Sequence, residues 1–441
     1  MKRESIIILS CIAGLSISCK KTQFDEVERT NGDADFTRYV AVGNSLTQGF
    51  QDGGVHNEKG QQDNSYPAIL ARQMAKVQPN MGEFVQPTVP GNGAGFLELE
   101  VNAEGELEAV DIPEDPNWEN WGDPEVSYNN LGISGIAVWN CYARSNNEGI
   151  INHALLGGVT LLGGGPLNPY AKFLDFGEDP LNIFSQDPTF SYVDKIRESE
   201  ATFFTCWLGN NDVLGWALAG GNEQETNIPL IGSLKLSPLT PVDEFTEKYD
   251  SCLAAFAASD AQGVCATLPD VTSIPMFTTV NEEYLGVDEL WITDNSGTVR
   301  LKTEEDLILL YALDAIDAGA GSSQSNPIGE DVVLDFEEKE MAQTRSNELN
   351  NVIYGLANKY GFGVVDMHGY LEGFKSGFNE DGVDLSARFV EGGVFSLDGV
   401  HPNQKGYAII ADKFIDAINL KYGANIPNVE INNYTGIYFP N

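Results

Sequence analysis

Short apolar runs alternate along the chain with longer segments in which apolar residues recur every three or four positions. A continuous apolar run is typical of a strand buried on both faces of a parallel sheet, and the longer period is typical of an amphipathic helix. Strands are predicted at residues 39–42, 126–131, 201–208, 263–268 and 363–366. Helices are predicted at residues 68–75, 241–258, 338–360 and 404–422. The alternation predicts an α/β fold with a mainly parallel sheet of five strands.

These elements form one predicted domain, residues 36–425, which is followed by a C-terminal tail at residues 426–441. Three loop-rich segments interrupt the alternation, and we expect long insertions at about 79–125, 149–190 and 280–340. A hairpin is predicted at residues 97–101 with a neighbouring strand, and a second around Asp294–Gly297. Residues 303–306 are predicted to begin a capped helix.

The first residues have the pattern of a targeting segment, which is excluded from the fold. Two basic residues precede an apolar run that is too short to span a bilayer comfortably, and Ser18 and Cys19 follow it. This pattern resembles a bacterial lipoprotein signal, so that residues 1–18 would be removed and Cys19 would carry the lipid. Residues 19–35 would then be a polar tether. The alternatives are an ordinary secretory signal or a buried apolar start.

Charge and composition narrow the class of partner. Hydrophobic residues make up 42% of the chain and charged residues 20%, as in a globular protein. The formal net charge of −40 argues against a nucleic acid or an anionic membrane surface as a partner. The acidic residues are scattered, which indicates a solvated acidic surface.

Four cysteines lie beyond the leader: Cys141, Cys206, Cys252 and Cys265. In an exported protein they could form up to two disulfides, and small buried thiols fit their apolar surroundings equally well. The sequence leaves both possibilities open. There is no CxxC motif or Cys/His cluster, so there is no zinc signature.

The chemistry is concentrated at the ends of predicted strands. Ser45 follows the first apolar run, where open α/β sheets keep their active sites. Near the other end of the chain, Asp398 and His401 stand three residues apart. Together they suggest nucleophilic catalysis of the Ser-His-Asp type. Two further stretches share this setting. The four are Gly43-Asn44-Ser45-Leu46, Asn130-Leu131-Gly132-Ile133-Ser134-Gly135, Gly209-Asn210-Asn211-Asp212 and Asp398-Gly399-Val400-His401-Pro402.

The order and type of these four stretches resemble the SGNH (GDSL-type) ester hydrolases, over a skeleton from about residue 39 to residue 423. The resemblance implies a flavodoxin-like three-layer α/β/α sandwich. It implies Ser45 as nucleophile, His401 as general base and Asp398 as the acid that orients the imidazole. The oxyanion hole would consist of the Ser45 N–H, the Gly132 N–H and the Asn211 side-chain amide. No metal or other cofactor is implied.

One position departs from the family motif, because Asn44 stands where Asp usually does. That Asp is not the acid of the triad, and Asn keeps its size and its acceptor oxygen.

Other polar residues have simpler interpretations. His368 could line a pocket but fits a structural histidine, and Asp270 fits a turn or cap. His56 and His153 have no identifiable partner. The acidic stretch at residues 379–384 lacks the ligand spacing of a calcium loop and fits a solvated turn. The six tryptophans are too dispersed for a carbohydrate platform, and packing is their default role.

The sequence therefore predicts a carboxylic ester hydrolase that works through an acyl-Ser45 intermediate and is anchored to the bacterial cell envelope, with the outer membrane as the expected site. Its substrate would be a lipid ester, another acyl ester or an acetylated glycan. The alternatives are a polysaccharide O-acetyl esterase, or an inactive surface binding lipoprotein on the same scaffold. Acyl chain length and oligomeric state are left open.

Overall fold

The computed structural model describes residues 28–116, 118, 121–123, 126–142, 169–174, 191–223, 225–228, 232–235 and 239–440. The predicted signal at residues 1–18, Cys19, most of the tether, most of the 149–190 insertion and His153 lie outside these residues. No helix in the described ranges is both long enough and apolar enough to cross a membrane.

A parallel sheet of four strands forms the centre of the molecule. Its order is β1 (Tyr39–Gly43), β4 (Phe203–Trp207), β7 (Gln262–Ala266) and β12 (Gly363–Val365). All five residues of β1 are buried, as the continuous apolar run predicted. The register pairs Val42 with Cys206, and Cys206 in turn with Cys265. The predicted α/β class with a mainly parallel sheet is confirmed.

The prediction of a strand at residues 126–131, the second of the five along the chain, is wrong. This segment runs parallel to β1 on its free side, but the ladder is reduced to a single bridge between Ala41 and Asn130. The side chains of Asn129 and Asn130 donate to the backbone oxygens of Tyr39 and Thr47. Such side-chain bonds compete with a regular ladder, so the segment stays irregular. It nevertheless lies at the edge of the sheet where strand 2 lies in the flavodoxin-like strand order 2-1-3-4-5.

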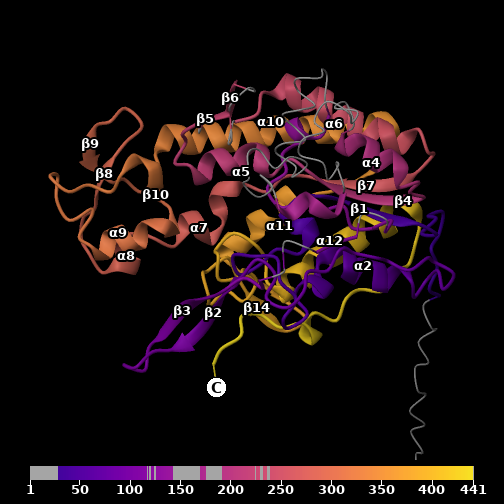
Figure 1. Cartoon of the computed structure of the whole chain (residues 1–441), viewed down its shortest axis with the longest axis horizontal. Coiled ribbons are helices and arrows are strands. Elements are labelled where there is room, and N and C mark those ends of the chain that lie inside the picture. Colours follow the sequence, from indigo (N-terminus) through magenta and orange to yellow (C-terminus); the bar gives the residue numbers. More distant parts are fainter. Residues whose placement is uncertain are drawn as a thin grey trace, which may run out of the picture.

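Helices cover both faces of the sheet, which gives a three-layer α/β/α sandwich (Figure 1). The helices on one face are α4 (Tyr192–Glu198), α5 (Asn211–Leu218), α6 (Val242–Ala257) and α10 (Phe336–Tyr360), and those on the other are α2 (Tyr66–Met74) and α12 (Gln404–Tyr422). Aromatic stacking joins the layers: Phe204 of β4 lies 3.9 Å from Phe256 of α6, between ring centroids. On the other side Trp207 of β4 lies 6.0 Å from Phe414 of α12, edge to face.

The long helices begin and end where local capping groups stand. At α10 the Asp335 carboxylate accepts the Glu338 N–H at 3.0 Å, while Glu338 accepts the Asp335 N–H at the same distance. This reciprocal capping box satisfies two N–H groups that the helix cannot. Asn403 caps α12, and Gly361 and Gly423 end the two helices with positive φ. The predicted helices at 338–360 and 404–422 are confirmed within two residues.

Both predicted hairpins are present. β2 (Phe96–Val101) pairs with β3 (Leu107–Ile112), and β8 (Trp291–Thr293) pairs with β9 (Val299–Leu301). The expected helix at residues 303–306 is instead a turn, because the Asp306 carboxylate accepts the Thr303 N–H and pairs with Arg300. Residues between 280 and 333 have a small hydrophobic core of their own.

The remaining elements are short. The helices and 3₁₀ turns are α1 (Ser45–Gln48), η1 (Gln62–Asn64), η3 (Val138–Asn140), η4 (Pro169–Leu174), η5 (Val271–Ser273), α7 (Pro275–Thr278), α8 (Glu282–Leu285), η6 (Leu310–Ala312), α9 (Leu313–Asp317), η7 (Glu330–Val332), α11 (Met367–Glu372), η8 (Gly373–Ser376) and η9 (Ile431–Asn433). The strands are β5 (Glu225–Ile228), β6 (Gly232–Lys235), β10 (Leu307–Ile308), β11 (Val333–Leu334), β13 (Phe378–Glu380) and β14 (Val383–Leu385).

The segment expected to be a C-terminal tail packs on the domain. Ile426, Val429 and Ile431 are buried, and the Val429 N–H donates to the Asp412 carboxylate of α12 at 2.6 Å. These apolar residues are too few to form a periodic pattern of their own, so their burial could not be predicted from the sequence.

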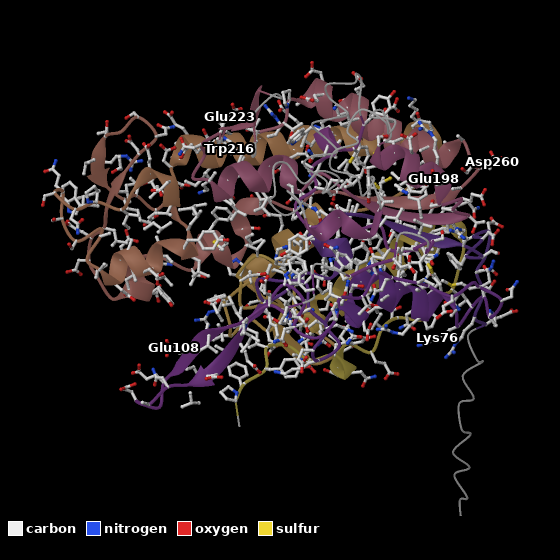
Figure 2. All side chains as sticks on the ribbon, in the orientation of Figure 1. Lys76, Glu108, Glu198, Trp216, Glu223 and Asp260 are labelled. Atoms are coloured by element: carbon white, nitrogen blue, oxygen red, sulfur yellow. The ribbon has the colours of Figure 1, made fainter. Side chains whose placement is uncertain are left out.

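The four cysteines beyond the predicted leader lie in the core, whereas many of the acidic residues lie on the surface. Cys141, Cys206, Cys252 and Cys265 are all buried and free, and burial raises the pKa of the Cys265 thiol to about 12. The buried-thiol interpretation is therefore confirmed. Glu108 of β3, Glu198 of α4 and Asp260, in the turn after α6, are exposed on the outside of the molecule (Figure 2).

Three buried carboxyl groups bind protons more tightly than in an unfolded chain. Burial raises the pKa of Asp212, Glu338 and Asp412 to about 7 in each case. A carboxyl whose pKa is raised in the folded state favours folding most below the unfolded pKa. That contribution is lost as the pH rises through the folded value. Because of these groups, the free energy of unfolding falls as the pH rises from about 4 to about 7.

We expect Asp412→Asn to remove part of this pH dependence, since the amide carries no charge and keeps an acceptor for the Val429 N–H. We compare the unfolding free energy of the variant with that of wild type at each pH. This difference should be more favourable to the variant at pH 8 than at pH 4, by on the order of 2–4 kcal/mol. Urea denaturation at the two pH values measures this. The exposed Asp288→Asn serves as the control. An unchanged pH dependence in Asp412→Asn would contradict the assignment.

Candidate active site

Ser45 lies at the carboxyl edge of the sheet, directly after β1 and at the first position of α1. The turn between them is tight, because a Cβ at Gly43 would lie 1.9 Å from Thr47 Oγ1. Asn44 caps α1 by accepting the Leu46 N–H at 3.1 Å. Asn44 therefore supplies the acceptor oxygen that was expected of it. The Ser45 side chain is held at the point where the sheet order reverses.

The structure brings together Ser45, His401 and Asp398. His401 Nε2 lies 2.8 Å from Ser45 Oγ, and His401 Nδ1 lies 2.9 Å from Asp398 Oδ2. The side chains of His401 and Asp398 are 13% and 12% exposed, so the pair is largely shielded from water. These distances allow proton transfer from the hydroxyl to the imidazole.

The Asp398 carboxylate is surrounded by donors. Oδ1 accepts the N–H groups of Val400 and His401, both at 2.8 Å, and the Ser396 hydroxyl at 3.0 Å. Oδ2 accepts the Gly53 N–H at 3.1 Å in addition to the His401 ring. Burial alone would raise the pKa of Asp398, but its pairing with His401 and these hydrogen bonds outweigh burial and lower it. Asp398 is therefore ionised and can pair with the protonated imidazole of His401.

A turn that follows Ser45 closely holds the acid in place. Asp52 and Gly53 have φ angles of +54° and +84°, which point both of their N–H groups toward the loop that carries Asp398. The Asp52 N–H donates to Ser396 Oγ at 2.9 Å, and the Asp52 carboxylate accepts the Leu397 N–H at 3.0 Å. Neither Asp52 nor Ser396 was singled out in the sequence. The only signal was that Ser396 lies two residues before Asp398.

An aromatic side chain covers the imidazole. The ring of Phe50 lies 4.4 Å from that of His401, centroid to centroid, with an interplanar angle of 37°. Tyr170 contacts Phe50 edge-on at 5.8 Å, and Trp118 lies 5.5 Å from Tyr170. An aromatic face beside a protonated imidazole is favourable because of the ring quadrupole. The sequence did not indicate this cluster, since its members lie on separate loops.

The three donors expected for an oxyanion hole differ in whether their hydrogens already bond to an acceptor within the protein. The Ser45 N–H has no acceptor among the described residues. The Gly132 N–H donates to Asn130 Oδ1 at 2.9 Å, and one hydrogen of the Asn211 amide is used by the Ile136 oxygen at 2.8 Å. Asn211 keeps a second hydrogen, whereas Gly132 has only one. Gly132 packs so closely on α1 that a Cβ would lie 2.5 Å from the Gln48 nitrogen.

The competing polar residues are structural. Asp270 caps η5 by accepting the Thr272 N–H, as the turn interpretation predicted. His368 Nδ1 lies 3.2 Å from the Leu268 oxygen, at the ends of β7 and β12. His56 is fully buried, stacks on Phe96 at 4.0 Å and lies 3.8 Å from the Asp52 carboxylate.

The acidic stretch at residues 379–384 forms the β13–β14 hairpin, as expected of a turn. Within the described ranges, no group of three or more His, Cys, Asp or Glu side chains is placed to hold a metal ion. Among the tryptophans, Trp118, Trp121, Trp207 and Trp216 are buried.

Comparison with known proteins agrees with this geometry. The profile of the family described as GDSL-like lipase/acylhydrolase matches residues 39–414, which include the whole sheet and the Ser45, Asp398 and His401 positions. The chain belongs to this family. It is accordingly a hydrolase that acts on ester bonds. No curated protein matches its sequence.

The similar solved structures are distant from this chain in sequence. An acetylxylan esterase from Geobacillus stearothermophilus is 12% identical, covering 88% of this chain and 96% of its own, with a TM-score of 0.37. An α/β hydrolase from the metagenome of Lake Arreo has the same identity, coverage and score. A GDSL-like lipase from Parabacteroides merdae, described in its title as putative, is 10% identical over 89% of this chain and 99% of its own, at 0.36. At these scores the likenesses carry no information on substrate.

We expect Ser396→Ala to lower the kcat of ester hydrolysis without unfolding the protein. The substitution removes one of the donors to Asp398 and the acceptor of the Asp52 N–H. Hydrogen bonds to charged groups are worth about 1.5–3 kcal/mol, so a loss of about 10-fold or more is expected, with KM little changed. Ser346→Ala is the matched control, since Ser346 is equally buried and its hydroxyl has no partner in the described structure. Equal kcat values for the two variants would contradict a positioning role for Ser396.

Proposed function

We propose that the protein hydrolyses carboxylic esters through an acyl-Ser45 intermediate. His401 Nε2 removes the proton from Ser45 Oγ as the oxygen attacks the ester carbonyl carbon. The protonated imidazole then passes that proton to the departing alkoxide as the C–O bond breaks, which releases the alcohol. A water molecule repeats the sequence on the acyl-serine and releases the carboxylic acid. The observation that carries this proposal is the continuous array from Ser45 Oγ through His401 to Asp398.

Asp398 supports the proposal because it is held as an anion against Nδ1 of His401. Its carboxylate fixes the tautomer in which Nε2 is free to accept the serine proton, and it stabilises the imidazolium that forms. The Phe50 ring, which packs against the imidazole, restricts its rotation and favours the protonated form.

In this proposal the oxyanion is bound first by the Ser45 N–H and by the second hydrogen of the Asn211 amide. Gly132 would contribute only if its N–H were shared between Asn130 and the oxyanion. Preorganised donors of this kind are each worth about 10²–10³ in rate. Asp212, the chain neighbour of Asn211, accepts the Val138 N–H at 2.8 Å and so holds the loop that ends at η3.

The direct test is hydrolysis of p-nitrophenyl acetate and butyrate by the chain from residue 20 onward, compared with Ser45→Ala and His401→Gln. Each substitution should lower kcat by about 10⁴-fold or more, because the nucleophile and its base act as a unit. Circular dichroism checks that the variants fold. Turnover that survives in Ser45→Ala would reject the assignment. A folded wild-type protein without turnover on any ester would favour the binding-lipoprotein alternative.

We further propose that the protein is exported and anchored through Cys19. The support is the basic start, the short apolar run and the Ser18-Cys19 pair that follows it. The chain expressed in a bacterium should incorporate an alkyne-tagged fatty acid, and Cys19→Ser should lose the label. Cys11→Ser is the matched control, since Cys11 lies inside the apolar run, and it should keep the label. Labelling that persists in Cys19→Ser would refute the anchor.

A further inference from the structure

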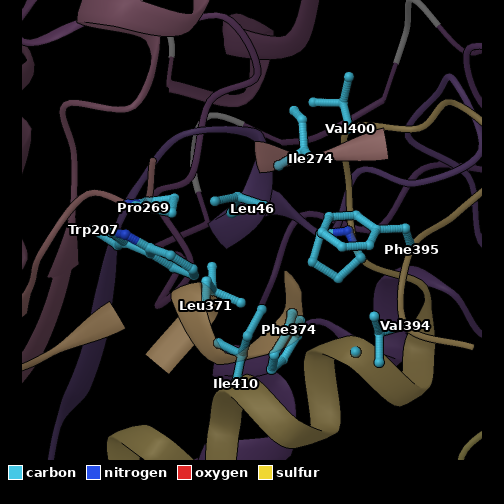
Figure 3. A pocket seen from close by; sticks show the side chains of 12 residues that line it. Leu46, Trp207, Pro269, Ile274, Leu371, Phe374, Val394, Phe395, Val400 and Ile410 are labelled. Carbon is cyan, nitrogen blue, oxygen red and sulfur yellow. The ribbon is translucent and has the colours of Figure 1, made fainter. Parts of the chain in front are cut away.

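An apolar cavity of about 50 Å³ lies against the chain segments that carry Ser45 and His401 (Figure 3). Leu46, which follows the nucleophile, lines one side of it. Val400 and Pro402, the two chain neighbours of His401, line another. The cavity therefore lies next to both chain segments that carry the nucleophile and its base.

The side chains that line the cavity favour an apolar, hydrocarbon ligand. Every residue that lines it is apolar or glycine except Trp207, whose indole N–H already donates to the Thr267 oxygen at 3.1 Å. No side chain is therefore available to bond a hydroxyl, a phosphate or a carboxylate in it. Apolar cavities of this kind exclude water and bind apolar groups. The alcohol part of a sugar ester would not be stabilised there, whereas an acyl chain would.

The size of the cavity limits the length of that chain. An apolar cavity of about 150 Å³ takes a benzene ring of six carbon atoms, so the volume here suffices for about two carbons on the same scale. Figure 3 shows Leu371, Phe374 and Ile410 close together on the side away from Val400 and Ile274. Ile410 belongs to the long helix α12 and is 3% exposed, so this wall is fixed by the core.

We propose that this cavity is the acyl-binding site and that it restricts the enzyme to esters of short-chain acids, of about four carbons or fewer. The proposal rests on the acyl-Ser45 mechanism given above. One carbon of the acyl group is the carbonyl carbon bonded to Ser45 Oγ, the next leads from it to the cavity, and about two more fill the cavity. An octanoyl chain would have to displace the wall formed by Leu371, Phe374 and Ile410.

The first experiment compares kcat/KM for p-nitrophenyl acetate, butyrate, hexanoate and octanoate. Wild type should fall by about 10-fold or more between butyrate and octanoate, since a misfitting methylene costs about 1–3 kcal/mol. Ile410→Ala should enlarge the cavity and raise the octanoate-to-butyrate ratio by about 10-fold. The control is Ile409→Ala, which truncates the same side chain one position earlier in the same helix. Ile409 is buried but does not line the cavity.

A narrowing variant tests the opposite direction. Leu371 is only half-buried on the short helix α11, so Leu371→Phe should be tolerated. It should lower kcat/KM for butyrate by about 10-fold while acetate changes little.

The outcomes separate the two proposals. Ser45-dependent turnover with a chain-length profile that neither Ile410→Ala nor Leu371→Phe alters would overturn the acyl site alone. A wild type that prefers octanoate would do the same. Absence of any Ser45-dependent turnover would overturn the catalytic proposal and this inference with it.

Discussion

The geometry of the site depends on one buried carboxylate, that of Asp398, which joins two turns 345 residues apart. A buried charge destabilises a protein strongly unless hydrogen bonds and an opposite charge compensate it. Here the N–H of Gly53 comes from one turn, and the N–H groups of Val400 and His401 come from the other. The two turns must therefore meet for Asp398 to be buried at low cost. Their meeting also sets the distance between His401 and Ser45.

The sheet explains why these turns are near each other. Ser45 follows β1 and Asn211 follows β4, and the two strands are parallel neighbours, so both residues emerge at the same edge. The segment at residues 129–133 flanks β1 on the other side, which makes β1 the point where the strand order reverses. Backbone hydrogen bonds to Ala41 and Gly43 hold this segment on β1, and the Asn130 side chain bonds it to α1, so that Gly132 lies close to the backbone of α1.

The insertion between residues 280 and 333 also contributes to the site, although it has its own small core. The Met276 N–H, just before this insertion, donates to the Gly399 oxygen at 2.8 Å. Gly399 has a φ of +70°, and a Cβ there would lie 3.2 Å from Leu310 Cδ2 and from the Met276 nitrogen. The loop between Asp398 and His401 is thus confined from both sides. Ile274, at the base of the same region, lines the apolar cavity beside it.

The sequence by itself determined the order of strands and helices, the bounds of α10 and α12, and the three side chains that meet in the hydrogen-bonded array. These features depend on local patterns: apolar runs, capping residues and short motifs at strand ends. Only the tertiary structure decided that the strand predicted at residues 126–131 is a single bridge, that Gly132 donates to Asn130, and that Asp52 and Phe50 support Asp398 and His401. It alone decided that the four cysteines stay free and that Leu46, next to the nucleophile, lines an apolar cavity. Each of these depends on contacts between residues distant in sequence, and the periodicity of apolar residues along the chain does not predict such contacts.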